Sequence, residues 1–454
     1  MDSKYYALFW EMGSGKTRAI LENVNRLYED GKVDTLIIIA PNGVHTNWPR
    51  RQAPLWLTVP YQTVVWNNKR HTKAWRIHLA DVLASDDLKI LAFNVEAFSR
   101  KGNDASKLIN QILHRSATRS FLVIDESSSI KNPKANRSKE IVKLSQSSGY
   151  RRILTGTPIT QGPFDIWMQG EALDKNIWRK NWYMFRQHHG EFRIARFGNR
   201  SFEELVCYRH MDEIKERLAE FSSEVIKAEC LDLPPKVYEV IDVELTKEQQ
   251  KAYKQMVDYY AAEVGTEVIT TDTPLTKLTK LHQIVTGHII DDEGSVHSIP
   301  HNRLKTLEVT LESLACKTII FCQFVAPIKE IMELLGNEAV EYSGRIVDDA
   351  RQQAIDKFQY DDAVKYIVIS LQSSGAYGLD LYNAGAVVYY CNGYSLERRM
   401  QSEDRAHRPG QSHECVTYVD IVCPGTVDEN VQQALTDKID VASQVTSLMT
   451  SWLR

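Results

Sequence analysis

Short apolar runs rich in β-branched residues recur through the first third of the chain. They lie at 35–40, 88–93, 121–124 and 152–154, and most are separated from the next by enough residues for a helix. Strands that alternate with helices in this way predict a parallel sheet buried on both faces. The loops after the carboxyl ends of such strands are where functional residues gather. We therefore expect an α/β lobe.

The same alternation returns after residue 300. Strand candidates lie at 318–322, 366–369, 386–390 and 416–421. A second α/β lobe is expected there, and a length of 454 residues is enough for two or three domains. The predicted fold class is α/β, with two lobes built on parallel sheets and helical additions between them.

The region between the lobes has helical patterns. In 246–264, Thr246 can cap a helix whose apolar face would hold Tyr253, Met256, Val257 and Tyr260. The run Leu233-Pro234-Pro235 is the clearest internal break, because proline resists helix and restrains the residue before it. The expected domains are 1–165, 166–300 and 301–454.

Charge and cysteine usage limit the classes of function. The formal charge of -4 excludes a uniformly basic protein, so any nucleic-acid contact must come from a local patch. The seven cysteines form no CxxC pair and indicate buried thiols in a reducing compartment. With neither a leader pattern nor a long apolar run, a soluble intracellular protein is expected, without membrane contact.

A glycine-rich segment, EMGSGKT at 11–17, precedes a helix-compatible stretch at 18–27. Glycines let backbone N–H groups turn toward phosphates at a helix N-terminus. Lys16 would reach the β- and γ-phosphates, and Thr17 would bind Mg²⁺. Because Trp10 replaces the first glycine of the strict pattern, a chance glycine-rich turn stays an alternative. The expected nucleotide-binding residues are Met12, Gly13, Ser14, Gly15, Lys16 and Thr17.

An acid pair follows the apolar run at 121–124. Asp125 is expected to hold the metal ion, and Glu126 to orient or deprotonate the attacking water. The alternative is a solvated acid pair at a strand end. In the second lobe, Arg405 and Arg408 would lie on one side of a helix and face a γ-phosphate, unless they only form a solvated helix face.

Seven segments occur in a fixed order along the chain. They are EMGSGKT (11–17), IIIAPNGVHTNW (37–48), VIDESSSIKN (123–132), LTGTPITQGPFDIW (154–167), IIFCQF (319–324), SGAYGLDL (374–381) and QSEDRAHRPGQ (401–411). This set resembles the Swi/Snf branch of the superfamily-two helicase-like ATPases, whose motor has two RecA-like lobes with ATP between them. The stretch at 405–411 is the most specific part of the match.

The resemblance implies a DNA-dependent ATPase that uses ATP and Mg²⁺ and moves along double-stranded DNA without separating its strands. It implies that Thr155, Gly156 and Thr157 couple the nucleotide to the DNA path, with Gln372 and Gly375 among the coupling residues. Gly378 and Gln401 would complete the nucleotide site from the second lobe. Asn42 and Asn47 lie in the loop that resembles the family's DNA-contacting segment, where Trp48 could instead be a packing residue.

Further expectations come from the same resemblance. A compact viral or bacterial relative is expected, working as a monomer in the cytoplasm of a bacterial or virus-infected host cell. Its protein partners would belong to replication, recombination or repair. Ser127-Ser128 departs from the family's usual residues and puts one coupling contact in question. The family's upstream adenine-reading segment has no counterpart before the phosphate loop, so we expect either relaxed adenine recognition or a chain without its natural start.

Basic, aromatic and histidine residues outside these segments have either a functional or a purely structural interpretation. Basic residues are densest at 50–51 and 69–76, where they could hold DNA phosphates or only form a solvated surface. Most of the tryptophans are expected in the core rather than in base stacking. His188-His189-Gly190 has no clustered cysteine or acid at ligand spacing, so no metal site is expected there.

Two other functions remain open from the sequence. The first is a strand-separating DNA or RNA helicase built on the same two lobes, which would need a separating element somewhere in 166–300. The second is a slow, nucleotide-switched DNA-binding protein. The presence of Lys16, Glu126, Arg405 and Arg408 together favours active hydrolysis over the switch.

Overall fold

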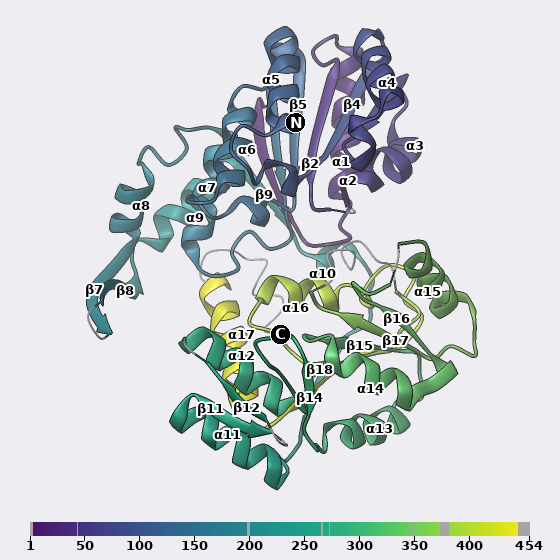
Figure 1. Cartoon of the computed structure of the whole chain (residues 1–454). Helices are drawn as coiled ribbons and strands as arrows, with labels where there is room; N and C mark the ends of the chain where they lie inside the picture. Colours follow the sequence, from purple (N-terminus) through teal and green to yellow (C-terminus); the bar gives the residue numbers. More distant parts are fainter. Residues whose placement is uncertain are drawn as a thin grey trace. The chain divides into compact units, whose positions relative to one another are not determined.

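The computed structural model describes residues 3–42, 44–197, 200–264, 267–271, 273–346, 348–372 and 381–443. The chain divides into two compact units (Figure 1). The first is Met1–Leu231 together with the end of the chain from Lys438, and the second is Asp232–Asp437. The division falls inside the region 166–300 and directly before the Leu233-Pro234-Pro235 break.

The first unit is built on a seven-stranded sheet in which every pair of neighbouring strands is parallel. The strand order is β3 (Tyr61–Val65), β4 (Leu88–Asn94), β2 (Thr35–Ala40), β5 (Ser120–Asp125), β6 (Tyr150–Leu154), β1 (Tyr5–Trp10) and β9 (Ser222–Val225). All residues of β2 and β5 are buried, as expected for strands covered on both faces.

Helices pack around this sheet (Figure 1). They are α1 (Lys16–Glu29), the short α2 (Val44–Asn47) and α3 (Ala53–Trp56), α4 (Lys73–Ala84), α5 (Asp104–Ser116), α6 (Asn136–Gln146) and α7 (Ile166–Leu173). A π-helical turn at Trp48–Gln52 joins α2 to α3. The hydrophobic core lies between α1 and strands β2, β4 and β5.

A long antiparallel hairpin, which we call the arm, extends from the first unit. It consists of β7 (Gly190–Phe197) and β8 (Arg200–Tyr208). Helix α8 (Trp182–His189) leads into it and α9 (Met211–Phe221) follows it. The arm projects away from the sheet (Figure 1), and most of the described residues of its two strands are exposed or half-buried, so the arm has no hydrophobic core of its own. After α9 come β9 and the short α10 (Lys227–Cys230).

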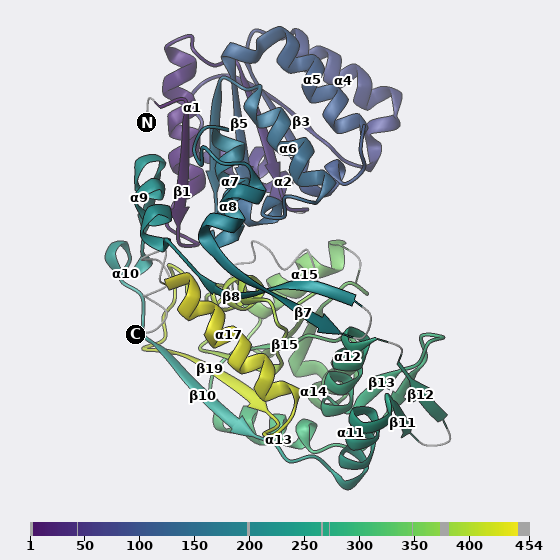
Figure 2. The same ribbon diagram turned by 90° about the vertical axis from the view of Figure 1, so that its left-hand side faces the viewer.

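The second unit has a six-stranded parallel sheet. Its order is β10 (Lys236–Asp242), β19 (Val416–Val422), β18 (Ala386–Cys391), β15 (Thr318–Cys322), β17 (Tyr366–Ser370) and β16 (Ala339–Tyr342). Figure 2 shows β10 lying along β19, which pairs the start of the unit with its end. Its helices are α11 (Lys247–Tyr259), α12 (Pro274–Val285), α13 (Arg303–Ser313), α14 (Ala326–Leu335), α15 (Asp348–Tyr360), α16 (Leu396–Glu403) and α17 (Val427–Ser443), whose last residues belong to the first unit.

The predicted α/β class with two parallel sheets is confirmed, and all eight predicted strands are present within one or two residues of their expected ends. The second unit also contains two short antiparallel hairpins. They are β11 (Ala261–Val264) with β12 (Glu267–Thr270), and β13 (His288–Ile290) with β14 (Val296–Ser298). Among the residues that the structure describes, no helix is long and apolar enough to span a membrane.

Two local predictions were wrong. The helix expected over 246–264 ends at Tyr259, because Tyr260 adopts a left-handed conformation and the chain continues as β11. Thr246 does cap the helix, but the buried face holds Gln249, Ala252 and Met256, while Val257 is exposed. The cysteines are also not uniformly buried, since Cys207 and Cys230 are exposed; all seven are free thiols.

Candidate nucleotide site

The glycine-rich segment forms a loop between β1 and α1. Gly13 and Gly15 have φ values of 82° and 89°, in the left-handed region that glycine enters without strain. Gly15 is the N-cap of α1, so the loop ends at the positive end of a helix. A loop of this kind at a helix N-terminus can turn backbone N–H groups toward a group rich in phosphate oxygens.

Side chains of the loop are held close to its backbone. The Lys16 Nζ donates to the carbonyl oxygens of Trp10 at 2.7 Å and Glu11 at 3.1 Å. Ser14 Oγ donates to the Glu11 oxygen at 2.6 Å. Met12 is buried, and Thr17 lies half-buried in the first turn of α1. The ammonium group of Lys16 is thus held by two carbonyl oxygens at the start of the loop.

A contact with α10 fastens the base of this loop. The buried Glu11 accepts a hydrogen bond at its Oε2 from the Lys227 backbone N–H, 2.5 Å away. The Lys227 side chain also comes close, since a Cβ on Gly13 would lie 3.7 Å from its Cε. Sequence reasoning missed Lys227 because it lies 211 residues after Lys16 (227 minus 16), and no local pattern marks it.

The acid pair lies at the carboxyl end of β5. The Asp125 Oδ2 accepts from the Trp48 indole Nε1 at 2.8 Å, and its Oδ1 accepts from the Glu126 N–H at 3.1 Å. Burial raises the pKa of Asp125, whereas the Trp48 hydrogen bond and the Lys16 charge act in the opposite direction. Trp48 is 2% exposed, so it holds Asp125 in place and is not available to DNA.

Glu126 has an unusual backbone. Its φ of 51° is left-handed, which is uncommon outside glycine and costs of the order of 1 kcal/mol or more. The Thr155 Oγ1 donates to the Glu126 Oε2 at 3.2 Å. The same Oγ1 accepts from the Thr157 N–H at 3.1 Å. Backbone strain and a buried threonine therefore fix the direction of this carboxylate.

The segment 155–157 lies between the loop and the acid pair. Strand β6, which ends at Leu154, runs between β5 and β1 in the sheet. Gly156 lies against the phosphate loop so closely that a Cβ there would be 3.2 Å from the Met12 backbone nitrogen. One short segment thus touches both the loop and Glu126. The structure brings these three predicted groups together within the first unit.

The second-lobe candidates lie in the second unit. Arg405 and Arg408 do not share a helix face, because α16 ends at Glu403 and both follow in turns. This corrects the helical interpretation of that stretch. Arg405 is 3% exposed, and its carbonyl accepts from the Leu381 N–H at 3.0 Å. Arg408 Nε donates to the Asp404 carbonyl at 2.8 Å.

The remaining candidates are more scattered. Gln401 is buried on α16, where its Nε2 donates to Glu397 at 3.4 Å. Gln372 is exposed after β17. Gly375 and Gly378 lie outside the described residues. Asn42 is exposed and Asn47 half-buried, in the loop and turn that follow β2.

The family model for the SNF2-related domain matches residues 6–288, and the model for the helicase conserved C-terminal domain matches 302–410. The chain is 24% identical over 445 residues to a DNA annealing helicase and endonuclease of Bos taurus, covering 95% of this chain and 38% of that protein. It is also 24% identical over 444 residues to an ATP-dependent helicase of Mycoplasma genitalium, covering 96% and 39%. It thus spans about two-fifths of the length of these curated relatives.

Among solved structures, the chain is similar to the Sulfolobus solfataricus SWI2/SNF2 ATPase core in complex with double-stranded DNA. The identity is 24%, the TM-score is 0.40, and the match covers 98% of this chain and 89% of that one. The SNF2-related model alone covers more than half of the chain. The predicted Swi/Snf resemblance and the helicase-like ATPase class are confirmed at the level of the family. The chain belongs to the SNF2-related family.

Proposed function

We propose that this chain hydrolyses ATP with Mg²⁺ and uses the energy to move along double-stranded DNA. The observation that carries the proposal is the meeting of three strand ends in the first unit. The phosphate loop follows β1, the acid pair follows β5, and the segment 155–157 follows β6 between them. The residues proposed to hydrolyse ATP are therefore in direct contact with the segment proposed to couple hydrolysis to movement.

The donor set fits a nucleotide triphosphate with its metal. The backbone N–H groups after Gly13 would receive phosphate oxygens, and Lys16 would release its loop carbonyls to bind them instead. The Thr17 hydroxyl and the Asp125 carboxylate offer oxygen ligands, which Mg²⁺ prefers. The chemistry that Mg²⁺ supplies in such a site is neutralisation of charge on the β- and γ-phosphates.

Glu126 is proposed to position the attacking water. Its carboxylate is aimed by the left-handed backbone and by Thr155, and a base in this role must be held within hydrogen-bond reach of the water. Any movement of 155–157 would change both the Glu126 hydrogen bond and the packing of Gly156 on the loop. That gives a physical route from hydrolysis to movement of the chain.

Double-stranded DNA is proposed as the track because of the family and the DNA-related name of one relative. With a net charge of -4, contacts with DNA phosphates must be local. Arg50, Arg51, Lys69, Lys73 and Arg76 are exposed and could serve, together with Asn42. Arg405, Arg408 and Gln401 of the second unit are proposed to complete the nucleotide site, as arginine fingers and a supporting amide.

The proposed setting is the cytoplasm of a bacterial or virus-infected cell. There the chain would act as a monomeric motor with partners in replication, recombination or repair. These partners follow from the resemblance alone.

The test is ATP hydrolysis by the purified chain with no polymer, duplex DNA, single-stranded DNA or RNA. Strong stimulation by duplex DNA that is weakened by salt is expected. Lys16→Ala should abolish it, whereas Lys107→Ala, at an exposed lysine paired with Asp104, should leave it unchanged. Displacement of a triplex strand from duplex DNA would then establish movement. Stimulation only by RNA or single strands would replace the proposal with a helicase, and no hydrolysis would replace it with a nucleotide switch.

A further inference from the structure

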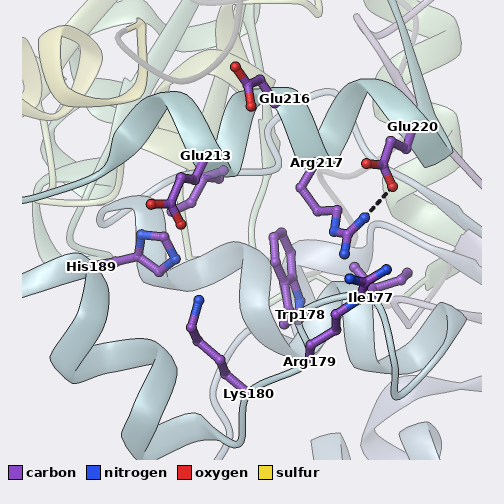
Figure 3. Close-up of a pocket in the computed structure, with 10 residues that line it drawn as sticks. Ile177, Trp178, Arg179, Lys180, His189, Glu213, Glu216, Arg217 and Glu220 are labelled. Atoms are coloured by element: carbon purple, nitrogen blue, oxygen red, sulfur yellow. Dashed lines mark hydrogen bonds and ion pairs between the residues drawn. The ribbon is translucent and has the colours of Figure 1, made fainter.

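A cluster of imidazole and carboxylate groups lies at the base of the arm, in the first unit. His188 and His189 are the last residues of α8, just before β7 begins. Glu213 lies in the first turn of α9, just after the arm returns. In Figure 3, His189 and Glu213 point toward one another across the space between the two helices. Nothing in the proposed nucleotide or DNA chemistry uses these residues.

The three side chains are arranged as metal ligands are. One potential ligand atom from each of His188, His189 and Glu213 lies within 4.8 Å of the other two. Among the described residues, no other group of three or more His, Cys, Asp or Glu side chains meets this condition. The His188 Nε2 is 2.8 Å from a Glu213 oxygen. Zinc bonds of about 2.0–2.2 Å need ligand atoms closer than 4.8 Å, so the three side chains would draw together when the ion binds.

His189 has the hydrogen bond that a zinc-binding histidine needs on its other nitrogen. Its Nδ1 is 3.3 Å from the Arg209 carbonyl oxygen, which can only accept, so Nδ1 carries the hydrogen. The lone pair is then on Nε2, free for a metal. The ring is 3% exposed and packs on Phe185 with ring centres 4.5 Å apart, which fixes its orientation.

The surrounding groups orient the other two ligands. The His210 ring stacks on His188 with centres 4.6 Å apart and planes 15° apart. Its Nδ1 lies 3.6 Å from the second Glu213 oxygen. Two imidazoles and one carboxylate suit zinc better than Mg²⁺ or Ca²⁺, which prefer oxygen ligands.

We propose that His188, His189 and Glu213 bind a zinc ion that closes the base of the arm. The ligands precede and follow the hairpin, so the ion would add a stronger link between α8 and α9 to the hydrogen bond of His188 with Glu213. Three protein ligands leave one position for water. A cavity of about 310 Å³ lined by His189, Glu213 and Trp178 adjoins this position (Figure 3). The arm has no core of its own, so a fixed base would set the direction in which it leaves the first unit.

The test measures zinc bound by the full chain, prepared without a histidine tag and stripped of metal. Equilibrium dialysis against Zn²⁺, followed by metal analysis, should give one ion per chain. Cobalt should bind in its place and show the absorption of a tetrahedral site. Loss of a residue that only hydrogen-bonds to a metal ligand costs about 10–100-fold in metal affinity. Loss of a direct ligand should cost at least as much, so His189→Ala and Glu213→Gln should each weaken zinc binding by about 100-fold or more.

The matched control is His297→Ala. His297 forms a 2.8 Å pair with Asp291, and no third ligand group lies beside it among the described residues, so its loss should leave zinc binding unchanged. Glu213 is exposed, so Glu213→Gln should fold even if the buried His189→Ala does not. The proposal is wrong if the chain takes up less than one zinc, or if Glu213→Gln binds zinc as tightly as the unchanged chain. ATP hydrolysis is read separately and plays no part in this result.

Discussion

Replacing Trp48 by phenylalanine tests how a hydrogen bond from the indole opposes the effect of burial on the pKa of Asp125. The change keeps an aromatic ring in the core but removes the indole N–H that donates to the Asp125 Oδ2 at 2.8 Å. A hydrogen bond to a buried charged group contributes about 1.5–3 kcal/mol. At about 2–4 °C per kcal/mol for a unit of this size, the melting temperature of the first unit should fall by about 3–12 °C.

The sign of the pH dependence follows from the direction of the pKa shift. Burial already raises the pKa of Asp125, and Trp48 opposes that rise. Without the indole N–H, the folded-state pKa rises further. Below the pKa of the unfolded state the carboxyl is protonated in both states, so the two proteins should be almost equally stable. The loss should appear as the pH rises through the folded-state pKa of Asp125 in the unchanged chain and be complete above its higher folded-state pKa in the variant.

Trp178→Phe is the matched control. Trp178 is also buried, and its Nε1 donates to the Trp167 carbonyl at 2.9 Å, which carries no charge. Its loss of stability should therefore be the same at acidic and neutral pH. Thermal unfolding of both variants over a pH series measures the difference. If the two variants lose stability with the same pH dependence, Trp48 does not stabilise the ionised form of Asp125.

Three further predictions concern single contacts. Thr155→Val removes the donor that aims Glu126, and kcat should fall by about tenfold or more with KM for ATP nearly unchanged, as steady-state hydrolysis would show. Gly156→Ala places a Cβ 3.2 Å from the backbone of the phosphate loop, so the affinity for an ATP analogue should fall several-fold in a titration. Arg303→Met leaves Asp428 buried without its cation, and denaturant unfolding should show a loss of about 3–5 kcal/mol in the second unit.

The controls for these variants are similar changes without the contact. Thr306→Val removes a hydroxyl that bonds only to its own helix, so kcat should not change. Gly344→Ala adds a Cβ with no neighbour within 4 Å and should leave analogue binding intact. Lys329→Met removes an exposed cation paired with Glu333 and should cost less than about 1 kcal/mol. If a variant and its control change kcat, analogue affinity or the free energy of unfolding equally, the contact in question does not have the proposed role.

The pattern of apolar runs predicted eight strands of the two sheets, because a parallel strand buried on both faces is mostly apolar. Strands β1, β3, β9 and β16 were not predicted. Strands β2 and β15 begin and end at the residues expected from the sequence. The edge strand β10 was missed, since most of its residues are partly or fully exposed and no apolar run marks it. The hairpin after Tyr260 was missed because a single left-handed residue ended a helical pattern that continued in the sequence.

The site residues that could be predicted are those whose position depends only on their neighbours in the sequence. The glycines and Lys16 belong to one turn, and Asp125 and Glu126 follow one strand. The order of the strands is a tertiary property, and it decides which loops meet. Trp48 and Lys227 therefore could not be assigned to Asp125 and Glu11 from the sequence, because their contacts span 77 and 216 residues. The acid opposite His188 and His189 was missed for the same reason, since the whole arm separates them from it.

Buried hydrogen bonds connect the acid loop to the part of the first unit that follows 155–157. The Ser127 hydroxyl donates to the Gln169 Oε1 at 2.6 Å, and the Gln169 Nε2 donates to the Pro158 carbonyl at 2.7 Å. The acid loop is thereby tied to the chain that follows 155–157. These groups are buried, so each bond is costly to leave unmade.

The same chain then reaches the arm. Asp165 accepts hydrogen bonds from the Thr160 and Gln161 N–H groups at 2.9 and 2.8 Å, which fixes the turn before α7. Phe164, beside it, packs on Tyr208 at the end of β8 with ring centres 5.3 Å apart. Hydrogen bonds and one aromatic contact therefore form a continuous path from the acid loop to the base of the arm. We expect a shift of the acid loop to move the base of the arm, because that breaks none of these buried bonds.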